Sequence, residues 1–146
     1  MFMEQYAQLN RAIEIAVKAH KGQVDINGQP YIGHPFRVMT AGHTLDEKIV
    51  GALHDVIEDS EITLDYLAAE GFSKEVIDGV DCMTKREGEK YSDYLTRIEH
   101  NPLAVRVKIN DLSDNMDIRR LDELTDEHIR RMKKYLKAYK RLTEKD

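Results

Sequence analysis

The chain has 146 residues, of which 41% are hydrophobic and 34% charged, with 27 acidic against 22 basic side chains. This length suits one domain with a buried core over residues 1–146, and the apolar content excludes a disordered chain. The net charge of −5 disfavours a non-specific nucleic-acid binder. The single cysteine, Cys82, excludes an internal disulfide framework and a cysteine-rich zinc site.

The sequence carries no sign of a membrane or secretory segment. No apolar stretch approaches the roughly 20 residues that are needed to span a bilayer. Residues 1–5 contain no basic region followed by an apolar run, which a secretory signal would require. We therefore expect a cytoplasmic protein with neither a membrane nor a nucleic-acid partner, and the oligomeric state is left open.

Apolar residues recur at three- and four-residue steps along most of the chain, which is typical of helices. In chain order, these steps and the capping residues predict helices over residues 4–20, 35–41, 44–59, 63–71, 73–83, 91–99, 102–115 and from 125 onward. Asn27 and Gly28 form a hairpin-turn signal, so residues 23–32 are expected to be a loop or a small hairpin. Because no alternating strand pattern of useful length occurs, the predicted fold class is all-α, a compact multi-helix bundle.

The segment around His54 and Asp55 contains one group of residues that could carry chemistry. Glu58 and Asp59 follow one turn later on the same predicted helix, which places two carboxylates beside the pair. Gly51, one turn earlier, gives up about 1 kcal/mol of helix propensity relative to alanine and would leave room above the pair. The pair fits a metal ion in the groove between its side chains, but such a dipeptide more often marks a solvated charged strip.

Two further places could contribute to a site. Asp111 lies on a largely apolar predicted helix, where a carboxylate costs free energy unless it is paired or binds a metal. Asn115 shares its face at the four-residue spacing. His34 precedes Pro35, which disfavours helical geometry at residue 34 and holds the imidazole at a helix entrance. Taken alone, a surface acid and a packing histidine are the commoner interpretations of these two residues.

Together, His34, His54, Asp55 and Asp111 supply two imidazoles and two carboxylates. This mixed nitrogen and oxygen set suits Mn, Fe, Zn or Ni better than Ca. Two carboxylates would neutralise a divalent ion, which could lower the pKa of a bound water and polarise a phosphoryl oxygen. The spacing by itself favours the metal site and the structural explanation about equally.

Five motifs occur in the order that is found in one enzyme group. They are AHKGQ at 19–23, GQPYIGHP at 28–35, LHDVIED at 53–59, TK at 84–85 and VKINDLSDNM at 107–116. The chain thereby resembles the HD superfamily of metal-dependent phosphohydrolases over residues 4–140. Within that superfamily it is similar to the hydrolase domain of the Rel/SpoT alarmone enzymes and to the stand-alone small alarmone hydrolases, including the metazoan SpoT homologue.

The resemblance implies a function and a set of site residues. It implies removal of pyrophosphate from the 3′ position of guanosine tetra- or pentaphosphate, with a divalent ion that is most often Mn²⁺, while Fe, Zn, Ni, Co and Mg stay possible. Glu58 and Asp59 would assist hydrolysis, and Asn115 would lie near the nucleotide. The implied metal ligands are His34, His54, Asp55 and Asp111.

One departure from the family keeps other functions open. Asp25 and Ile26 stand where the family usually has a basic pair, whose arginine packs on guanine, and an acid cannot make that cation–π contact. A second hypothesis is therefore an HD-type phosphatase acting on NADPH or a nucleoside monophosphate. A third, less favoured because the ligand set is complete, is a catalytically silent nucleotide-binding module.

Local cations must steer an anionic substrate toward a protein of net negative charge. For each candidate a solvated surface position is the commoner state; the candidates are Lys21, Lys85 and Lys108, with Arg37 and Arg86 as further cations. Tyr91 and Tyr94 belong to the core or face the cleft, the core being favoured.

Overall fold

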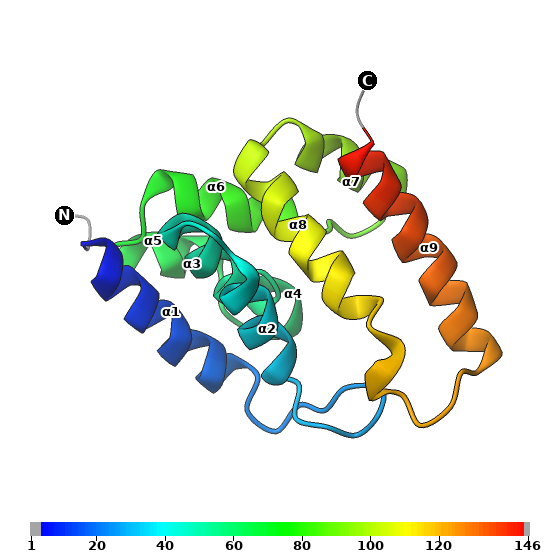
Figure 1. Ribbon diagram of the computed structural model, residues 1–146. Helices are drawn as coiled ribbons and strands as arrows, with labels where there is room; N and C mark the ends of the chain where they lie inside the picture. The colour runs from blue at the N-terminus through cyan, green and yellow to red at the C-terminus, as the bar shows by residue number, and fades with distance from the viewer. Residues whose placement is uncertain (1–3, 145–146) are drawn as a thin grey trace.

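The computed structural model describes residues 4–144, which are helical almost throughout (Figure 1). The helices are α1 (Gln5–Ala19), α2 (Gly33–Ala41), α3 (Leu45–Leu53), α4 (Val56–Asp59), α5 (Leu64–Ala69), α6 (Lys74–Met83), α7 (Tyr91–Glu99), α8 (Pro102–Asn115) and α9 (Asp126–Thr143), with a 3₁₀ turn η1 (Ile118–Arg120). No strand forms between residues 4 and 144, and this confirms the predicted all-α class. Within the same range, no helix is long and apolar enough to cross a membrane. Residues 1–3, part of the segment searched for a secretory signal, lie outside the described residues.

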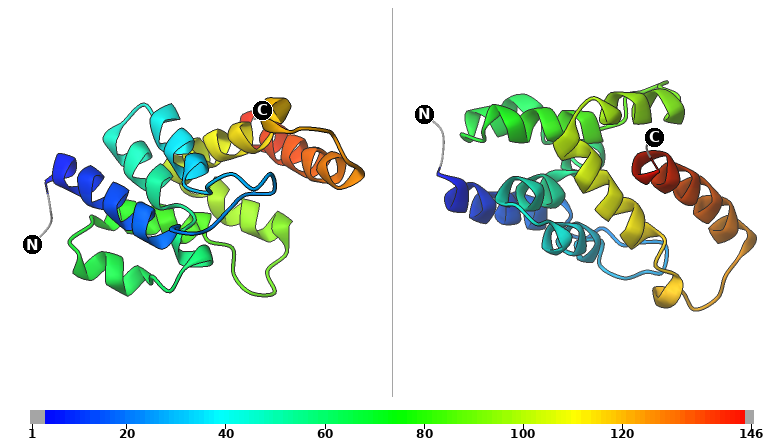
Figure 2. Two further views of the ribbon diagram at one scale, coloured as in Figure 1. Left: turned by 90° about the horizontal axis from the view of Figure 1, so that it is seen from below. Right: turned by 45° about the horizontal axis from the view of Figure 1, so that its top comes forward.

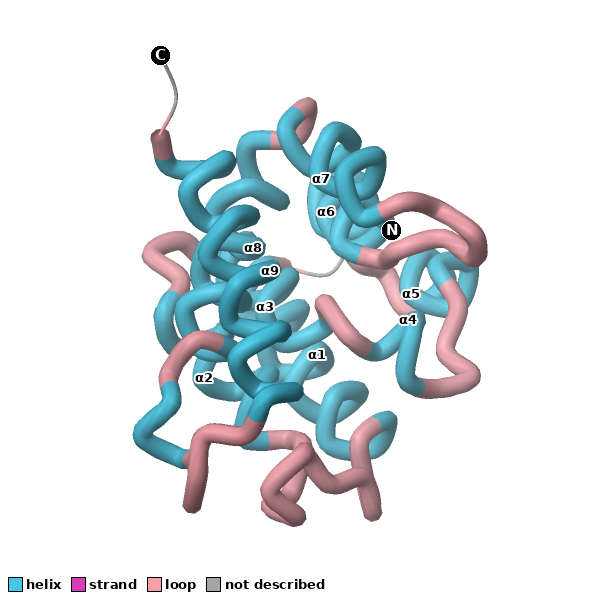
Figure 3. The backbone as a smooth tube through the Cα atoms, turned by 90° about the vertical axis from the view of Figure 1, so that its right-hand side faces the viewer, coloured by secondary structure: helices cyan, strands magenta, loops and turns pink. Residues whose placement is uncertain are grey.

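Helix α3 is the centre of the bundle. It packs against α1, α2, α6 and α8, and most of its residues are buried, including Ile49, Val50 and Leu53. α8 crosses the middle of the molecule (Figure 1), and α9 runs along the outer side of α8 (Figure 3). The loop between α1 and α2 comes to lie beside η1 at one end of the bundle (Figure 2).

Side-chain caps set the starts of the helices where the sequence predicts them. Each cap oxygen accepts a backbone N–H that the first helical turn leaves unpaired, a contact that contributes about 1 kcal/mol to helix stability. The caps are Thr44, Thr63, Ser73, Asn101 and Thr125. The expected loop or hairpin over residues 23–32 is a loop that holds one isolated antiparallel bridge between Val24 and Pro30.

The prediction of a single helix over residues 44–59 is wrong, because the helix is interrupted at His54 and Asp55. α3 ends at Leu53 and α4 begins at Val56. In a continuous helix the carbonyl of residue 51 would accept the N–H of residue 55. Here the ring Nδ1 of His54 lies 2.6 Å from the carbonyl oxygen of Gly51. The break therefore places this His–Asp pair in a turn rather than on a regular helix face.

The sequence suggested that Gly51 leaves room above that pair, but the structure gives this glycine another role. A Cβ at this position would lie 3.0 Å from both Cα and N of Met39 in α2, closer than ordinary packing allows. The glycine therefore lets the backbones of α2 and α3 approach each other closely. This contact holds α2, which begins at Gly33 and so includes His34 in its first turn despite Pro35, against α3, which ends before His54.

Candidate metal centre and the cavities beside it

Three buried side chains from three helices meet at one point. His34 comes from the first turn of α2, His54 follows the end of α3, and Asp111 belongs to α8. The His34 Nε2 atom lies 2.8 Å from Asp111 Oδ1 and 3.2 Å from His54 Nε2. One ligand atom from each residue lies within 4.8 Å of the others, close enough for the three residues to bind one metal ion together.

Asp55 faces the same point. Its Oδ2 atom lies 3.1 Å from His54 Nε2 and 3.7 Å from His34 Nε2, and it accepts a 2.5 Å hydrogen bond from the hydroxyl of Tyr31. The structure thus brings together, in one cluster, the four side chains that the sequence predicts as ligands: His34, His54, Asp55 and Asp111. The break between α3 and α4 makes this possible, because it frees Asp55 from the helical spacing.

The outer nitrogen of each imidazole is already engaged. His34 Nδ1 lies 2.7 Å from Asp114 Oδ2, and His54 Nδ1 lies 2.6 Å from the Gly51 carbonyl oxygen. Both Nδ1 atoms therefore donate to oxygen, which leaves both Nε2 atoms facing the carboxylates, where each would offer its lone pair to a bound ion. Metal-binding histidines usually have such a partner, because it fixes the ring and its tautomer. The residues present therefore fit a divalent ion.

The charges of the cluster depend on one another. Burial opposes protonation of His34, but its hydrogen bonds with Asp111 and Asp114 outweigh burial and raise its pKa. Burial likewise opposes charge on His54, whose pKa is nevertheless raised well above the usual value by Asp55 and Asp111. Against burial, His54 lowers the pKa of Asp55 to about 2. The carboxylates thus stay ionised and attract positive charge, either protons on the imidazoles or a metal ion.

Asp111 has a further partner in Lys108. The buried Lys108 Nζ donates a 2.8 Å hydrogen bond to Asp111 Oδ2. Burial alone would raise the pKa of Asp111, but the Lys108 ammonium and the two histidines hold this pKa well below its usual range. Asn115 Nδ2 donates to the other oxygen of Asp111 at 3.2 Å. Lys108 therefore orients a ligand carboxylate, in addition to lining the cavity beside it.

The two carboxylates of α4 diverge. Glu58 lines the same cavity as the cluster, and its Oε1 accepts the backbone N–H of Lys85 at 2.5 Å. Burial raises the pKa of Glu58, and the charges of Asp55 and Asp59 raise it further. Asp59 lines a separate cavity between α1 and α5, and burial together with Asp55 raises its pKa. Of these two carboxylates, Glu58 lines the cavity at the cluster, while Asp59 acts on the cluster through its charge.

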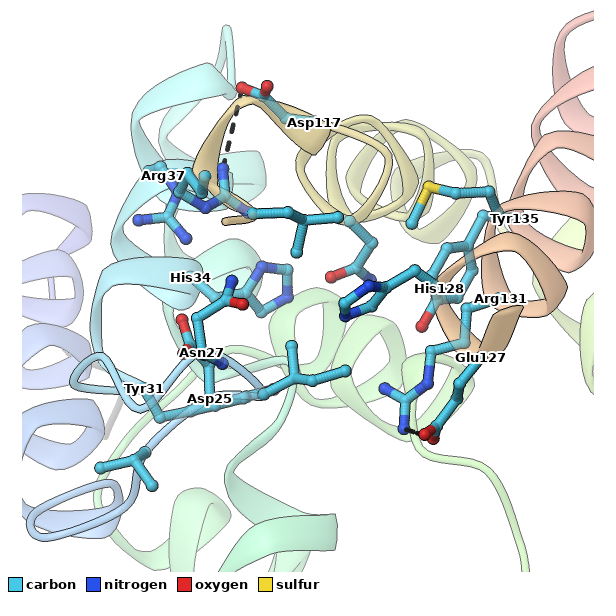
Figure 4. Close-up of a pocket in the computed structure, with 16 residues that line it drawn as sticks. Asp25, Asn27, Tyr31, His34, Arg37, Asp117, Glu127, His128, Arg131 and Tyr135 are labelled. Carbon is cyan, nitrogen blue, oxygen red and sulfur yellow. Dashed lines mark hydrogen bonds and ion pairs between the residues drawn. The ribbon is translucent and has the colours of Figure 1, made fainter. Parts of the chain in front are cut away.

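Two cavities adjoin the cluster. The larger, of about 550 Å³, lies between the loop after α1, η1 and the start of α9. Figure 4 shows Asp25 and Asn27 on one side of this cavity, and Glu127 and His128 on the other. The smaller, of about 220 Å³, reaches from the cluster toward α7 and α9. Four residues border both cavities: Tyr31, His34, Asn115 and Tyr135.

The candidate cations separate into two groups. Lys85 and Lys108 line the smaller cavity, as Asn115 does, whereas Arg37 lines the larger cavity. Lys21 is exposed and lines neither of these cavities, and the same holds for Arg86, which lies 3.8 Å from Asp81. The structure therefore does not bring Lys21 or Arg86 to the cluster.

Asp25 and Ile26 occupy the wall of the larger cavity. One oxygen of Asp25 accepts the backbone N–H groups of Asn27 and Gln29, both at 2.9 Å, and so closes the turn. Ile26 is 52% exposed and presents an apolar side chain to the opening. At this wall the carboxylate of Asp25 stabilises the loop, and an apolar surface is offered to a ligand.

Tyr31 and helix α9 supply site residues to which the sequence assigns no role, and two tyrosines that were expected in the core also reach the site. Tyr31 lies within a quoted motif, and its hydroxyl is the hydrogen-bond partner of Asp55. Tyr91 and Tyr94 both line the smaller cavity, although Tyr94 is also a core residue. Lys134 and Tyr135 in α9 line the cavity without any motif around them, and only the packing of α9 on α8 brings them there.

Comparison with known proteins identifies several relatives. The chain is 32% identical over 121 residues to a probable GTP pyrophosphokinase of Mycobacterium leprae, covering 74% of this chain and 15% of that protein. It is 36% identical over 134 residues to a guanosine-3′,5′-bis(diphosphate) 3′-pyrophosphohydrolase of Haemophilus influenzae, covering 82% of this chain and 20% of that protein. The protein of the same name from Borreliella burgdorferi is 32% identical, with 73% and 18% covered. The chain thus spans about a fifth or less of the length of these relatives.

A solved structure has the same fold. It is a metazoan orthologue of SpoT, described as hydrolysing ppGpp, and it aligns with a TM-score of 0.76 at 18% identity. The alignment covers 97% of this chain and 87% of that protein. No protein-family model matches the chain. By sequence over most of its length, and by fold, this chain therefore resembles a Rel/SpoT-type HD hydrolase domain.

Proposed function

We propose that this chain is a metal-dependent pyrophosphohydrolase that removes pyrophosphate from the 3′ position of guanosine tetra- or pentaphosphate. The observation that carries this proposal is the meeting of His34, His54, Asp55 and Asp111 at one buried point beside the carboxylate of Glu58. The relatives are named both as pyrophosphokinases and as pyrophosphohydrolases. Imidazole and carboxylate ligands with a carboxylate base nearby are the equipment of metal-assisted hydrolysis, and this favours the hydrolase.

We assign the divalent ion to His34, His54, Asp55 and Asp111. Mn²⁺ is the expected ion, and Fe, Zn, Ni, Co and Mg are the alternatives, because a mixed set of imidazoles and carboxylates does not select one of them. When bound, the ion supplies Lewis-acid chemistry, lowering the pKa of a coordinated water and polarising a phosphoryl oxygen. Asp114 and the Gly51 carbonyl hold the two imidazoles in the orientation that such an ion needs.

Glu58 is the proposed proton acceptor. Its pKa, raised mainly by burial, lies closer to neutral pH than that of an exposed glutamate, which suits an exchange of protons with water. The backbone N–H of Lys85 fixes the orientation of its carboxylate. In the reaction a water oxygen bonds to the phosphorus that is attached to the 3′ oxygen. The bond from this phosphorus to the 3′ oxygen breaks, and the 3′ oxygen takes a proton. Asp59 contributes through its charge, since its side chain borders another cavity.

A second candidate function keeps the metal centre and changes the substrate. It is an HD-type phosphatase acting on NADPH or a nucleoside monophosphate. The observation in its favour is the wall of the larger cavity, where Asp25 closes a turn and Ile26 is apolar, so that neither position offers a cation to stack on guanine. A silent nucleotide-binding module is the least favoured function, because both the ligand set and Glu58 are in place.

Substrate profiling with the manganese-loaded protein tests these alternatives. Guanosine tetraphosphate, NADPH and nucleoside monophosphates are incubated separately, and pyrophosphate and orthophosphate release are measured. Pyrophosphate release from guanosine tetraphosphate alone is the expected result. Orthophosphate release from NADPH or a monophosphate, without pyrophosphate, would transfer the assignment to the second candidate. Tight nucleotide binding with no turnover would favour the silent module.

The domain organisation, the partners and the location of the protein are proposed from the sequence as well. Residues 1–146 are proposed to act as one domain on a small-molecule nucleotide. The cytoplasmic location and the absence of a nucleic-acid partner stay predictions from the charge and composition of the chain.

A further inference from the structure

The two cavities beside the cluster differ in how their cations are paired. Every arginine that lines the larger cavity already has an acidic partner. Arg37 Nε lies 2.7 Å from Asp114. Arg120 lies 3.2 Å from the same carboxylate, and Arg131 lies 3.2 Å from Glu127.

The smaller cavity contains cations without such partners. Among residues 4–144, neither the Lys85 nor the Lys134 ammonium has a hydrogen bond or ion pair with a carboxylate, and both side chains line this cavity. Lys134 Nζ lies 4.1 Å from the centre of the Tyr91 ring, a cation–π contact that holds the ammonium at the cavity wall. Burial and the nearby charges of Lys108 and Lys85 lower the pKa of Lys134, consistent with crowded positive charge.

A second polar group in the smaller cavity also lacks a partner. The Tyr91 hydroxyl is buried and makes no hydrogen bond within the described residues, whereas the neighbouring Tyr94 donates to the Met83 carbonyl oxygen at 2.8 Å. A buried hydroxyl without a partner costs free energy, and a ligand oxygen that enters the cavity would remove this cost. Two free ammonium groups and one free hydroxyl therefore surround the same space.

The two cavities differ in size as well as in the pairing of their cations. The larger, of about 550 Å³, falls within the range of roughly 300–1,000 Å³ that is common for organic ligands. The smaller, of about 220 Å³, lies below that range and suits a compact group. Because both cavities reach His34 and Asn115, one ligand can lie across the cluster with an end in each.

We propose that Lys134 and Tyr91, with Lys85, form the subsite for the diphosphate end of the substrate, and that the larger cavity takes the nucleoside. This inference rests on the proposed pyrophosphohydrolase function. Water then attacks the phosphorus nearest the cluster, the bond from that phosphorus to the nucleoside oxygen breaks, and the nucleoside oxygen takes a proton. Pyrophosphate, which gains the water oxygen, leaves from the lysine-lined cavity. Lys134 and Tyr91 contact this group and therefore act as binding residues.

Calorimetric titration with methylenediphosphonate, which cannot be hydrolysed, tests the subsite directly. The full chain is titrated once with a chelator present and once loaded with Mn²⁺. Lys134→Gln should weaken binding about tenfold in both conditions, since one charge-assisted hydrogen bond is lost. The matched control is Lys137→Gln, because Lys137 is an exposed lysine of the same helix that lines neither cavity. It should bind within twofold of the unchanged protein.

Tyr91→Phe removes only the unpaired hydroxyl. It should weaken binding of methylenediphosphonate about threefold to tenfold while leaving the melting temperature unchanged or higher, because no internal hydrogen bond is lost. A fall in melting temperature without weaker binding would show a structural role and overturn the assignment of Tyr91. Guanosine, which has no phosphate, should bind equally to all the variants.

The outcomes separate this inference from the proposed function. If Lys134→Gln and Tyr91→Phe bind methylenediphosphonate as Lys137→Gln does, the subsite is wrong, even where pyrophosphate is released from a nucleotide. If both variants weaken binding while no nucleotide releases pyrophosphate, the subsite holds and the proposed reaction is wrong.

Discussion

Helices α8 and α9 both line the site, but they hold their polar groups in opposite ways. In α8, Lys108 and Asp111 are buried and paired with each other, and the helix packs against α2, α3, α6, α7 and α9. α9 packs mainly against α8, and its cavity residue Lys134 has no acidic partner within the described chain. Buried charges must be satisfied internally, whereas charges at an open wall can be left for a ligand.

The comparison indicates that the two sides of the site are held in place with different firmness. The cluster side is held by several helices and by hydrogen bonds on His34, His54 and Asp111, which fix the orientation of these side chains. The position of α9 depends on a few apolar contacts, among them Ala138 and Leu142, and on the pairing of Arg141 with Glu99 at 2.7 Å. Changes in α8 should therefore affect the ion, and changes in α9 should affect the nucleotide.

The largest effect is expected from Asp111→Asn. This change removes a ligand carboxylate and leaves the buried Lys108 ammonium without its anion. Manganese affinity should fall by at least about 100-fold, and hydrolysis should fall with it, as measured by metal content after dialysis and by pyrophosphate release.

Two further variants control this prediction. Asp117→Asn alters a carboxylate of the larger cavity that is outside the cluster, and it should keep its manganese. If Asp111→Asn does not fold, Asp55→Asn removes a ligand while leaving Lys108 paired with Asp111. Retention of a full equivalent of manganese by either ligand variant would contradict the assigned site.

Glu58→Gln should separate chemistry from metal binding. The amide can still accept the Lys85 N–H but cannot take a proton, so turnover should fall roughly 10²- to 10⁴-fold with the metal content unchanged. Glu61→Gln, an exposed change three residues further along the chain, is the control and should keep full activity. A full rate in Glu58→Gln would remove this residue from the mechanism.

Leu142→Ala tests the other side of the comparison. Leu142 is 3% exposed, and truncating such a side chain costs roughly 2–5 kcal/mol of unfolding free energy. Because α9 is loosened, the KM for nucleotide should rise severalfold, while manganese affinity should stay within about twofold. Urea unfolding, steady-state kinetics and metal titration measure the three quantities.

The control for Leu142→Ala is Leu136→Ala. Leu136 belongs to the same helix and is 48% exposed, so its truncation should change none of the three quantities by much. Loss of manganese in Leu142→Ala, with the rest of the fold intact, would show that α9 supports the cluster as well as the nucleotide.

The smallest expected effect is a pH dependence of the chelator-treated protein. The raised pKa of His34 means that protonation stabilises the folded state, an effect fully present below the unfolded pKa of about 6.5. This stability is lost as pH rises from there through the higher folded-state pKa. Protons also compete with the ion, so manganese affinity should increase over the same pH range by up to about tenfold per unit for each histidine.

Melting temperatures between pH 5 and pH 9, with chelator and with excess manganese, measure this dependence. The chelator-treated protein should lose stability toward high pH, and the loaded protein should not. Parallel curves in the two conditions would contradict the competition between protons and the ion.

Much of the fold follows from local signals in the sequence. Thr44, Asn101 and Thr125 cap helices where predicted, because a cap needs only its own side chain and the next backbone turn. The break at His54 was not predicted, because it depends on the ring bonding to the Gly51 carbonyl inside a packed bundle. The four candidate ligands were found from residue type and motif, and the structure places them together without identifying the ion.

The all-α class, the starts of the capped helices and the residues that could hold a metal ion follow from the sequence alone, since these depend on periodicity, capping and side-chain chemistry. Which side chains meet depends on the tertiary structure. It turned Asp55 toward the cluster, paired Lys108 with Asp111, and brought Lys134 over Tyr91. Such contacts join segments far apart in the chain, and they exist only once the buried faces of the helices have packed.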